Sequence, residues 1–335
     1  MNKLLHTPEG FRDVYGTEFL KKNIVKNTLT DKIKEFGYMN IETPTVEYFD
    51  VFSSNIGTIP SNELYKFFDK EGNTLVLRPD FTPSIARVAA TYFADYKEPL
   101  RFMYSGNTFT NSSDLQGRLK EVTEVGCELI NDGSVDADYE IISMVCNLFK
   151  ALKIKDIQIS IGNAEFFKGL CEESKMDKDT ELSLREMISD KNYFSAEAIL
   201  DGTSIDAKLK NSILAVPDLF GKEECLIEAE KIAVNERSKN AVKRLKDIYE
   251  LAKKDGIEKY ISFDFGILSK YNYYTGIVFR GYTYGSGDAI FKGGRYDNLL
   301  SEFGKNAPAV GFVATVDQLV EVMNRREEGF ALCDI

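Results

Sequence analysis

The chain has 335 residues, of which 43% are hydrophobic and 28% are charged. That length allows a large core and more than one domain, and the composition is ordinary for a soluble protein. A formal net charge of −11 argues against a general binder of nucleic-acid backbones. No apolar run approaches the roughly eighteen residues of a membrane span, and the first residues lack the apolar core of a signal peptide. We therefore expect a cytoplasmic protein without a membrane partner.

The usage of histidine and cysteine excludes several kinds of active site. His6 is the only histidine, which removes histidine-based triads and HExxH metal sites. The five cysteines are widely spaced and form no CxxC pair, so we expect reduced, buried thiols and no metal site. They are Cys127, Cys146, Cys171, Cys225 and Cys333. The chain also lacks a P-loop and a complete GxGxxG motif, and we expect no cofactor.

The amino-terminal part predicts a helix followed by an interrupted strand. Apolar residues recur at helical spacing from Glu18 to Phe36, and Gly37 suits the position just after a helix. The predicted buried stripe consists of Leu20, Ile24, Leu29, Ile33 and Phe36. The extended segment that follows contains Pro44, which favours an edge strand or a break.

The most informative stretch runs from Leu75 to Ile130. Its end, EVTEVGCELI, places Glu124, Gly126 and Glu128 on one face of a strand and apolar side chains on the other. The two carboxylates would lie about 13 Å apart, with room for a ligand at the glycine between them. Taken alone, this pattern favours an ordinary solvated face of an antiparallel sheet.

The rest of the chain alternates between strands and helices. In chain order we expect a strand at Arg101–Ser105, a polar loop at Ser112–Glu121, a helix at Asp136–Leu152, a strand at Lys153–Asn163, a helical region at Ala164–Gly256, a strand at Ile261–Phe265 and a helix capped near Thr315.

Several motifs together resemble the class II aminoacyl-tRNA synthetases, in their histidyl version. LRPDFT with the later GRLKEVTEVGCEL is similar to motif 2, and PAVGFVATVDQLVEVM is similar to motif 3. YYTG before IVF, and GGRYD, resemble the two histidine-specific motifs. The helix and proline-containing strand between Glu18 and Phe52 resemble motif 1, which forms the homodimer interface in that family.

The resemblance implies an α+β fold in which an antiparallel sheet is flanked by helices. It implies a discontinuous core of residues 1–163 and 257–325, a helical insertion at 164–256 and a short tail at 326–335. It also implies that the chain has no anticodon-binding domain and no tRNA partner.

Three positions depart from the synthetase pattern. Thr110, Ser269 and Gln318 stand where the family carries arginines that bind ATP phosphates and the amino-acid carboxylate. A neutral side chain cannot replace the five-donor fork of arginine or stabilise the charge that develops during adenylation. We therefore expect no catalytic residues and no ligase activity.

The residues that would hold the amino acid are kept. By the resemblance, Asp80 and Thr82 bind the ammonium group of histidine, and Glu124 stands where a glutamine is usual. Glu128 and Tyr274 would read the imidazole, with Tyr273 beside them. Carboxylates suit an ammonium and an imidazole N–H, because ionised acceptors form the stronger hydrogen bonds.

A histidyl-type scaffold without adenylation residues is similar to the family of ATP phosphoribosyltransferase regulatory subunits. The similarity implies a short catalytic subunit as partner, histidine as ligand and a role in feedback at the first step of histidine biosynthesis. Two alternatives remain open. One is a divergent amino-acid ligase, and the other is a histidine-sensing module for a different partner.

Overall fold

The structure is a computed structural model that describes residues 3–53, 59–112, 118–268 and 273–326. Ser269, Cys333, the middle of the predicted loop Ser112–Glu121 and nearly all of the predicted tail lie outside the described residues.

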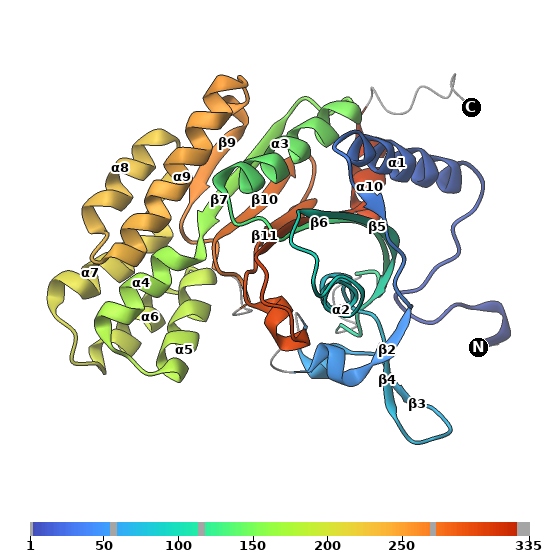
Figure 1. The fold of residues 1–335 in the computed structure, drawn as a ribbon, viewed down its shortest axis with the longest axis horizontal. Helices are drawn as coiled ribbons and strands as arrows, with labels where there is room; N and C mark the ends of the chain where they lie inside the picture. The colour runs from blue at the N-terminus through green and yellow to red at the C-terminus, as the bar shows by residue number, and fades with distance from the viewer. Residues whose placement is uncertain (1–2, 54–58, 113–117, 269–272, 327–335) are drawn as a thin grey trace.

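A large twisted sheet organises the molecule, with the strand order β1-β5-β6-β12-β11-β10-β7-β9-β8 (Figure 1). Its strands are β1 (Met39–Asn40), β5 (Leu100–Phe109), β6 (Glu121–Ile130), β7 (Ile157–Asn163), β8 (Phe220–Gly221), β9 (Ile261–Asp264), β10 (Ile277–Thr283), β11 (Phe291–Arg295) and β12 (Ala309–Thr315). The pairs β1–β5 and β7–β9 are parallel and the other pairs are antiparallel. A small second sheet has the order β2-β4-β3, from β2 (Val46–Tyr48), β3 (Lys66–Phe68) and β4 (Thr74–Leu77).

Helices cover both faces of the large sheet. They are α1 (Gly16–Glu35), α2 (Thr82–Tyr92), α3 (Val135–Ala151), α4 (Ala164–Ser174), α5 (Lys178–Ser189), α6 (Tyr193–Asp201), α7 (Ala207–Ala215), α8 (Glu223–Ile232), α9 (Glu236–Lys254) and α10 (Val316–Arg325). None of these helices, nor any other in the described ranges, is long and apolar enough to cross a membrane. The architecture is the α+β fold that the sequence predicts.

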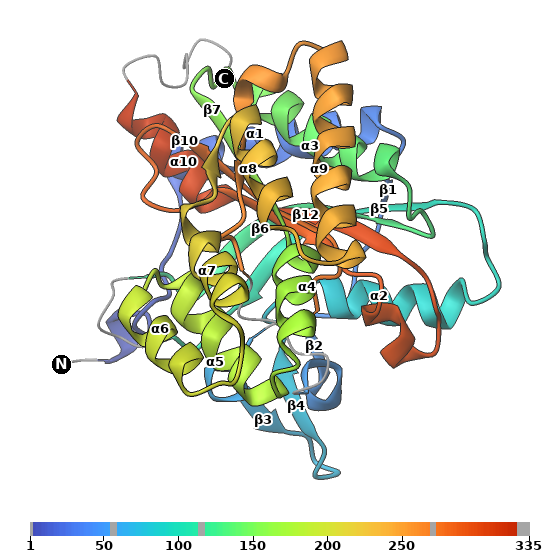
Figure 2. The same cartoon turned by 90° about the vertical axis from the view of Figure 1, so that its left-hand side faces the viewer.

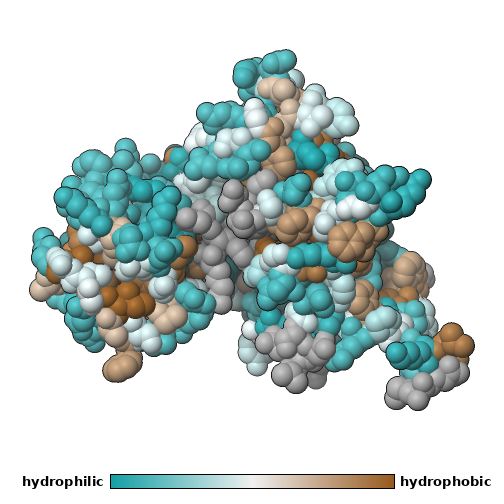
Figure 3. All heavy atoms as spheres, turned by 90° about the horizontal axis from the view of Figure 1, so that it is seen from below, coloured by the Kyte–Doolittle hydropathy of each residue, from teal (hydrophilic) through white to brown (hydrophobic). Residues whose placement is uncertain are grey.

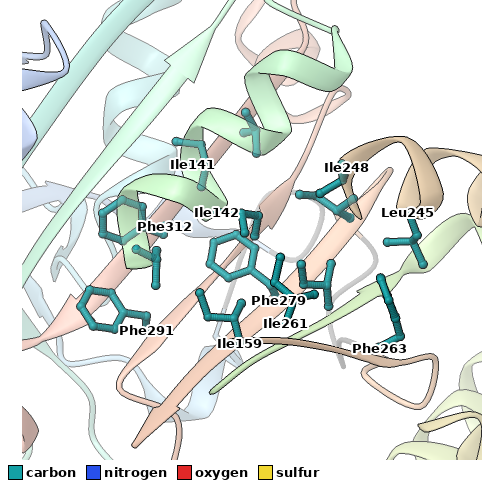
Figure 4. Close-up of a cluster of buried hydrophobic side chains, with 14 of the residues drawn as sticks. Ile141, Ile142, Ile159, Leu245, Ile248, Ile261, Phe263, Phe279, Phe291 and Phe312 are labelled. Carbon is teal, nitrogen blue, oxygen red and sulfur yellow. The ribbon is translucent and has the colours of Figure 1, made fainter. Parts of the chain in front are cut away.

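The main core lies between one face of the sheet and helices α1, α3, α9 and α10. Ile141 and Ile142 of α3 point onto the strands that carry Ile159, Phe279 and Phe291, as Figure 4 shows (Figure 4). Alternate residues of β6 contribute Val125, Cys127 and Leu129 to the same core, which confirms the predicted apolar face. The four described cysteines are buried free thiols, also as predicted.

The opposite face of the sheet carries a smaller core around α2. Ile85 and Ala89 of this helix pack with Phe102, Leu300 and Ala309. This core fills only one side of that face, and the space beside it is the cavity described below. The two faces of β6 therefore lead to different environments, one apolar throughout and the other partly open.

The predicted stripe of α1 is only half right. Leu29 and Ile33 are fully buried, but Leu20 and Ile24 are 42% and 37% exposed, and Val25 is buried instead. The buried face of the helix is the row Val25, Leu29 and Ile33. Ile24 lies about 140° around the helix from Leu29, so Leu20 and Ile24 face away from the core. Gly37 has a φ of +83°, as expected for the residue after a helix end.

Helices α4 to α9 form a lobe at one side of the sheet, seen at the left in Figure 1 and facing the viewer in Figure 2 (Figure 2). From below, the surface is hollowed between this lobe and the rest of the molecule (Figure 3). A buried cluster ties the lobe to the sheet: Asp138 is fully buried and accepts hydrogen bonds from Arg295 of β11 and Arg244 of α9, each at 2.7 Å.

At the other end of the chain, Thr315 takes the predicted position before α10. Its side chain, however, makes no capping hydrogen bond to that helix.

Candidate functional site

A cavity of about 400 Å³ opens on the α2 face of the sheet. All six residues singled out in the sequence line it: Asp80, Thr82, Glu124, Glu128, Tyr273 and Tyr274. They come from the start of α2, from β6 and from the segment before β10, which are far apart in the sequence. Ser189, at the end of α5, brings the helical lobe to the same cavity.

The floor of the cavity includes a row of residues across five strands, and three of these residues are glycines. Glu128 of β6 lies opposite Gly311, which lies opposite Gly294, and the row continues through Val278 to Gly162. A Cβ atom at Gly311 would collide with the Glu128 carboxylate, and one at Gly294 would come within 2.6 Å of the Tyr274 ring. These glycines therefore create the room above the sheet that the acidic and aromatic side chains occupy.

The predicted open space at Gly126 is filled by the protein itself. A Cβ atom there would collide with the hydroxyl of Tyr104, whose ring stacks on Phe81 with 4.4 Å between centroids. The glycine thus admits a side chain from the neighbouring strand. Because Tyr104 lines the cavity, a ligand there would meet its hydroxyl.

Glu128 is the most enclosed acid of the site, at 2% exposure. It accepts a hydrogen bond from Thr82 Oγ1 at 2.8 Å and another from the Tyr296 hydroxyl. Burial raises the pKa of Glu128 to about 8, although these two donors oppose the shift. Near neutral pH the carboxyl is therefore mostly protonated until a donor or a cation of the ligand approaches.

Glu124 and Asp80 form an acidic pair in the same cavity. Burial, and then the negative charge of Asp80, raise the pKa of Glu124 to about 8, against a hydrogen bond with Thr108. Asp80 accepts a hydrogen bond at 2.9 Å from the backbone N–H of Thr82, so its carboxylate is fixed at the start of α2. A cationic ligand between these acids would relieve their mutual repulsion.

The two tyrosines form a tilted pair, with ring centroids 4.2 Å apart and an interplanar angle of 31°. Burial raises the pKa of Tyr273 well above its usual value, so the hydroxyl stays protonated and can donate. The helical lobe fixes the pair, because Lys168 of α4 donates a hydrogen bond to the Tyr274 carbonyl at 2.7 Å.

Sequence reasoning missed several residues of the cavity: Tyr104, Arg280, Lys292 and Tyr296. Tyr296 belongs to GGRYD, so that motif indicates its presence at the site. Arg280 and Lys292 carried no such signal, because their juxtaposition depends on the pairing of β10 with β11.

Arg78, in the LRPDFT motif, links two neighbouring segments of the backbone. It is 6% exposed, and its guanidinium donates to the carbonyls of Asn107 and Thr43 and lies 4.1 Å from the Phe81 ring centroid.

Two of the three altered positions, Thr110 and Gln318, line a separate cavity of about 750 Å³. Its described lining contains three cationic and five acidic side chains. They are Arg12, Arg118, Lys292, Glu18, Glu63, Asp288, Asp317 and Glu321. An excess of carboxylates opposes a polyphosphate. No cluster of three metal-ligating side chains occurs in the described ranges.

Comparisons with known proteins agree on one fold. A profile of the family described as histidyl-tRNA synthetase matches residues 10–319. Proteins named ATP phosphoribosyltransferase regulatory subunit from Acetivibrio thermocellus and Ruminiclostridium cellulolyticum are 40% and 38% identical to the chain. Both alignments cover 97% of this chain and 78% of the relative.

Solved structures give the same result. One described as an ATP phosphoribosyltransferase regulatory subunit/histidyl-tRNA synthetase from Bacillus halodurans has a TM-score of 0.88 at 32% identity, over 95% of this chain and 83% of that one. A histidine–tRNA ligase subunit from Alicyclobacillus acidocaldarius has a TM-score of 0.82 at 26% identity, over 96% and 98%.

Proposed function

The chain belongs to the family of ATP phosphoribosyltransferase regulatory subunits, and on that premise we propose that it binds free histidine and reports it to a short catalytic subunit. In this proposal the catalytic subunit needs the chain for full activity, and histidine bound to the chain inhibits the complex. The chain performs no reaction and binds no tRNA. Residues 164–256 act as a helical insertion in the core formed by 1–163 and 257–325.

The observation that carries the proposal is the shared cavity of Asp80, Thr82, Glu124, Glu128, Tyr273 and Tyr274. Its acids suit the ammonium group and an imidazole N–H, and its tyrosines offer flat apolar faces with a hydroxyl at the edge. Histidine carries an ammonium group, an imidazole N–H and a flat ring in one molecule.

The absence of adenylation chemistry is supported by the second cavity. Thr110 and Gln318 are neutral, and the Gln318 Oε1 atom is buried without a hydrogen-bond partner among the described residues. One of the cations there is already engaged with acids: Arg12 pairs with Glu18 and lies 3.8 Å from Asp317.

A homodimer through the segment Glu18–Phe52 is supported by the surface of α1. Leu20, Ile24 and Phe19 are exposed on this helix, and Phe19 is 51% exposed. Clustered exposed apolar side chains mark interaction sites, and two-fold interfaces are the commonest kind.

The test is reconstitution with the short catalytic subunit, measuring phosphoribosyl-ATP formation against rising histidine. The double variant Asp80→Ala/Glu128→Ala should assemble and activate normally but need more histidine for inhibition, because coupled sites typically exchange about 1–3 kcal/mol. Inhibition at the wild-type histidine concentration would exclude this cavity as the sensor.

A second assay separates this function from the ligase alternative. The purified chain should show no histidine-dependent ATP–pyrophosphate exchange. Exchange above background would identify the chain as an enzyme. Failure to bind any phosphoribosyltransferase, with histidine binding intact, would instead favour a sensor for another partner.

A further inference from the structure

The cavity floor carries two positive charges directly opposite each other. Arg280 of β10 pairs in register with Lys292 of β11, and both line the cavity. Side chains that face each other across a strand pair lie on the same face of the sheet, so the guanidinium and the ammonium share one space. Like charges in this arrangement destabilise a sheet unless something of opposite charge lies between them.

The protein supplies little compensation for this pair. Lys292 forms an ion pair with Asp288 at 2.9 Å, but both side chains are about half exposed, and exposed pairs contribute little. Asp264 and Asp288 act on Arg280 at longer range, and Glu124 acts on Lys292 in the same way. Arg280 forms no hydrogen bond or ion pair with another residue of the described ranges, and it is only partly exposed.

The acidic and the cationic side chains of the cavity lie on one face of the sheet but on different strands. Along one row, Gly126 of β6 lies opposite Val313 of β12, which lies opposite Lys292 and then Arg280. With strands about 4.8 Å apart, Gly126 and Lys292 lie about 10 Å from each other at the backbone, and Glu124 and Glu128, two residues to either side of Gly126, lie about 12 Å from Lys292. Long side chains from both edges can reach a small ligand between them, and such a ligand must be positive on one side and negative on the other.

We infer that Arg280 and Lys292 hold the carboxylate of a free α-amino acid whose ammonium group faces the acids of β6 and α2. This inference rests on the proposed function. It identifies the residues that distinguish a free amino acid, which carries a carboxylate, from an ester or an adenylate of that amino acid. Arginine matches a carboxylate with two parallel hydrogen bonds, and lysine adds a point charge beside it. The pair thus supplies two cationic donors for one carboxylate at this cavity.

The experiment is calorimetry with histidine and with histidinol, in which a hydroxymethyl group replaces the carboxylate. The variants are Arg280→Gln and Lys292→Gln, with Lys243→Gln on the exposed side of α9 as a control for net charge. Wild type and the control should prefer histidine to histidinol by about tenfold or more, equivalent to about 1.4 kcal/mol. Each cavity variant should lose most of that preference by weakening histidine alone, while its melting temperature stays equal or rises.

Different failures have different meanings. Wild-type protein that binds neither ligand would overturn the histidine site and this inference with it. Wild-type protein that binds histidine tightly, with variants that retain the full preference, would overturn the carboxylate assignment and leave the site standing. Equal weakening of both ligands would also overturn it, because the residues would then shape the cavity rather than bind the carboxylate.

Discussion

Histidine binding should release protons and become tighter between pH 7 and pH 8. In the unliganded protein, burial raises the pKa values of Glu124 and Glu128 to about 8, whereas a ligand with an ammonium and an N–H donor favours their ionised forms. Binding therefore depresses both pKa values, and below pH 8 protons must leave. For a pKa of about 8, the ionised fraction rises from about 9% at pH 7 to about 50% at pH 8, so each participating carboxyl adds about fivefold in affinity.

The assay is calorimetry at pH 7.0, 7.5 and 8.0 in two buffers with different ionisation enthalpies. The imidazole of free histidine, with a pKa of about 6.5, is already mostly neutral in this range and adds little. Glu128→Gln should remove one released proton and flatten the pH profile by about fivefold, whereas Glu173→Gln, at an exposed position of α4, should change neither. A dissociation constant independent of pH, with no buffer dependence of the enthalpy, would refute the ionisation of these acids on binding.

Two other predictions concern assembly and stability. Leu20→Asp with Ile24→Asp should convert a dimer into a folded monomer by light scattering; an unchanged mass would place the interface elsewhere. Asp138→Asn should lower the free energy of unfolding by about 3–5 kcal/mol in urea titration, because Arg295 and Arg244 would lose their shared carboxylate. A change below about 1 kcal/mol would mean that water replaces that carboxylate.

Local alternation was enough to predict the two faces of β6. Val125 and Cys127 had to be buried together if the segment was a strand, and the acids at 124 and 128 then had to share the other face. Alternation alone could not distinguish a solvated face from the wall of a cavity. That distinction depends on α2 and on the tyrosine pair, which pack over the strand from distant parts of the chain.

The predicted stripe of α1 combined two faces of the helix. Ile24 lies about 140° around the helix from Leu29, so Leu20 and Ile24 do not share a face with Leu29 and Ile33. Here α3 and the sheet contact the face of Val25, Leu29 and Ile33, so Leu29 is buried and Leu20 is not. An exposed apolar turn is costly in a monomer, and this is why the discrepancy favours an interface.

Arg280 and Lys292 show most clearly that the register of paired strands brings together residues whose proximity the sequence does not indicate. Arg280 and Lys292 are twelve positions apart by their numbering, and each alone reads as an ordinary polar residue on a strand. Pairing of β10 with β11 places them opposite each other, and pairing of β11 with β12 and β6 places them on the face of Glu128. A shift of one residue in either pairing would send one cation into the apolar core, where its charge would lack a partner. The same hydrogen-bond ladder that fixes the core therefore also fixes where a carboxylate can bind.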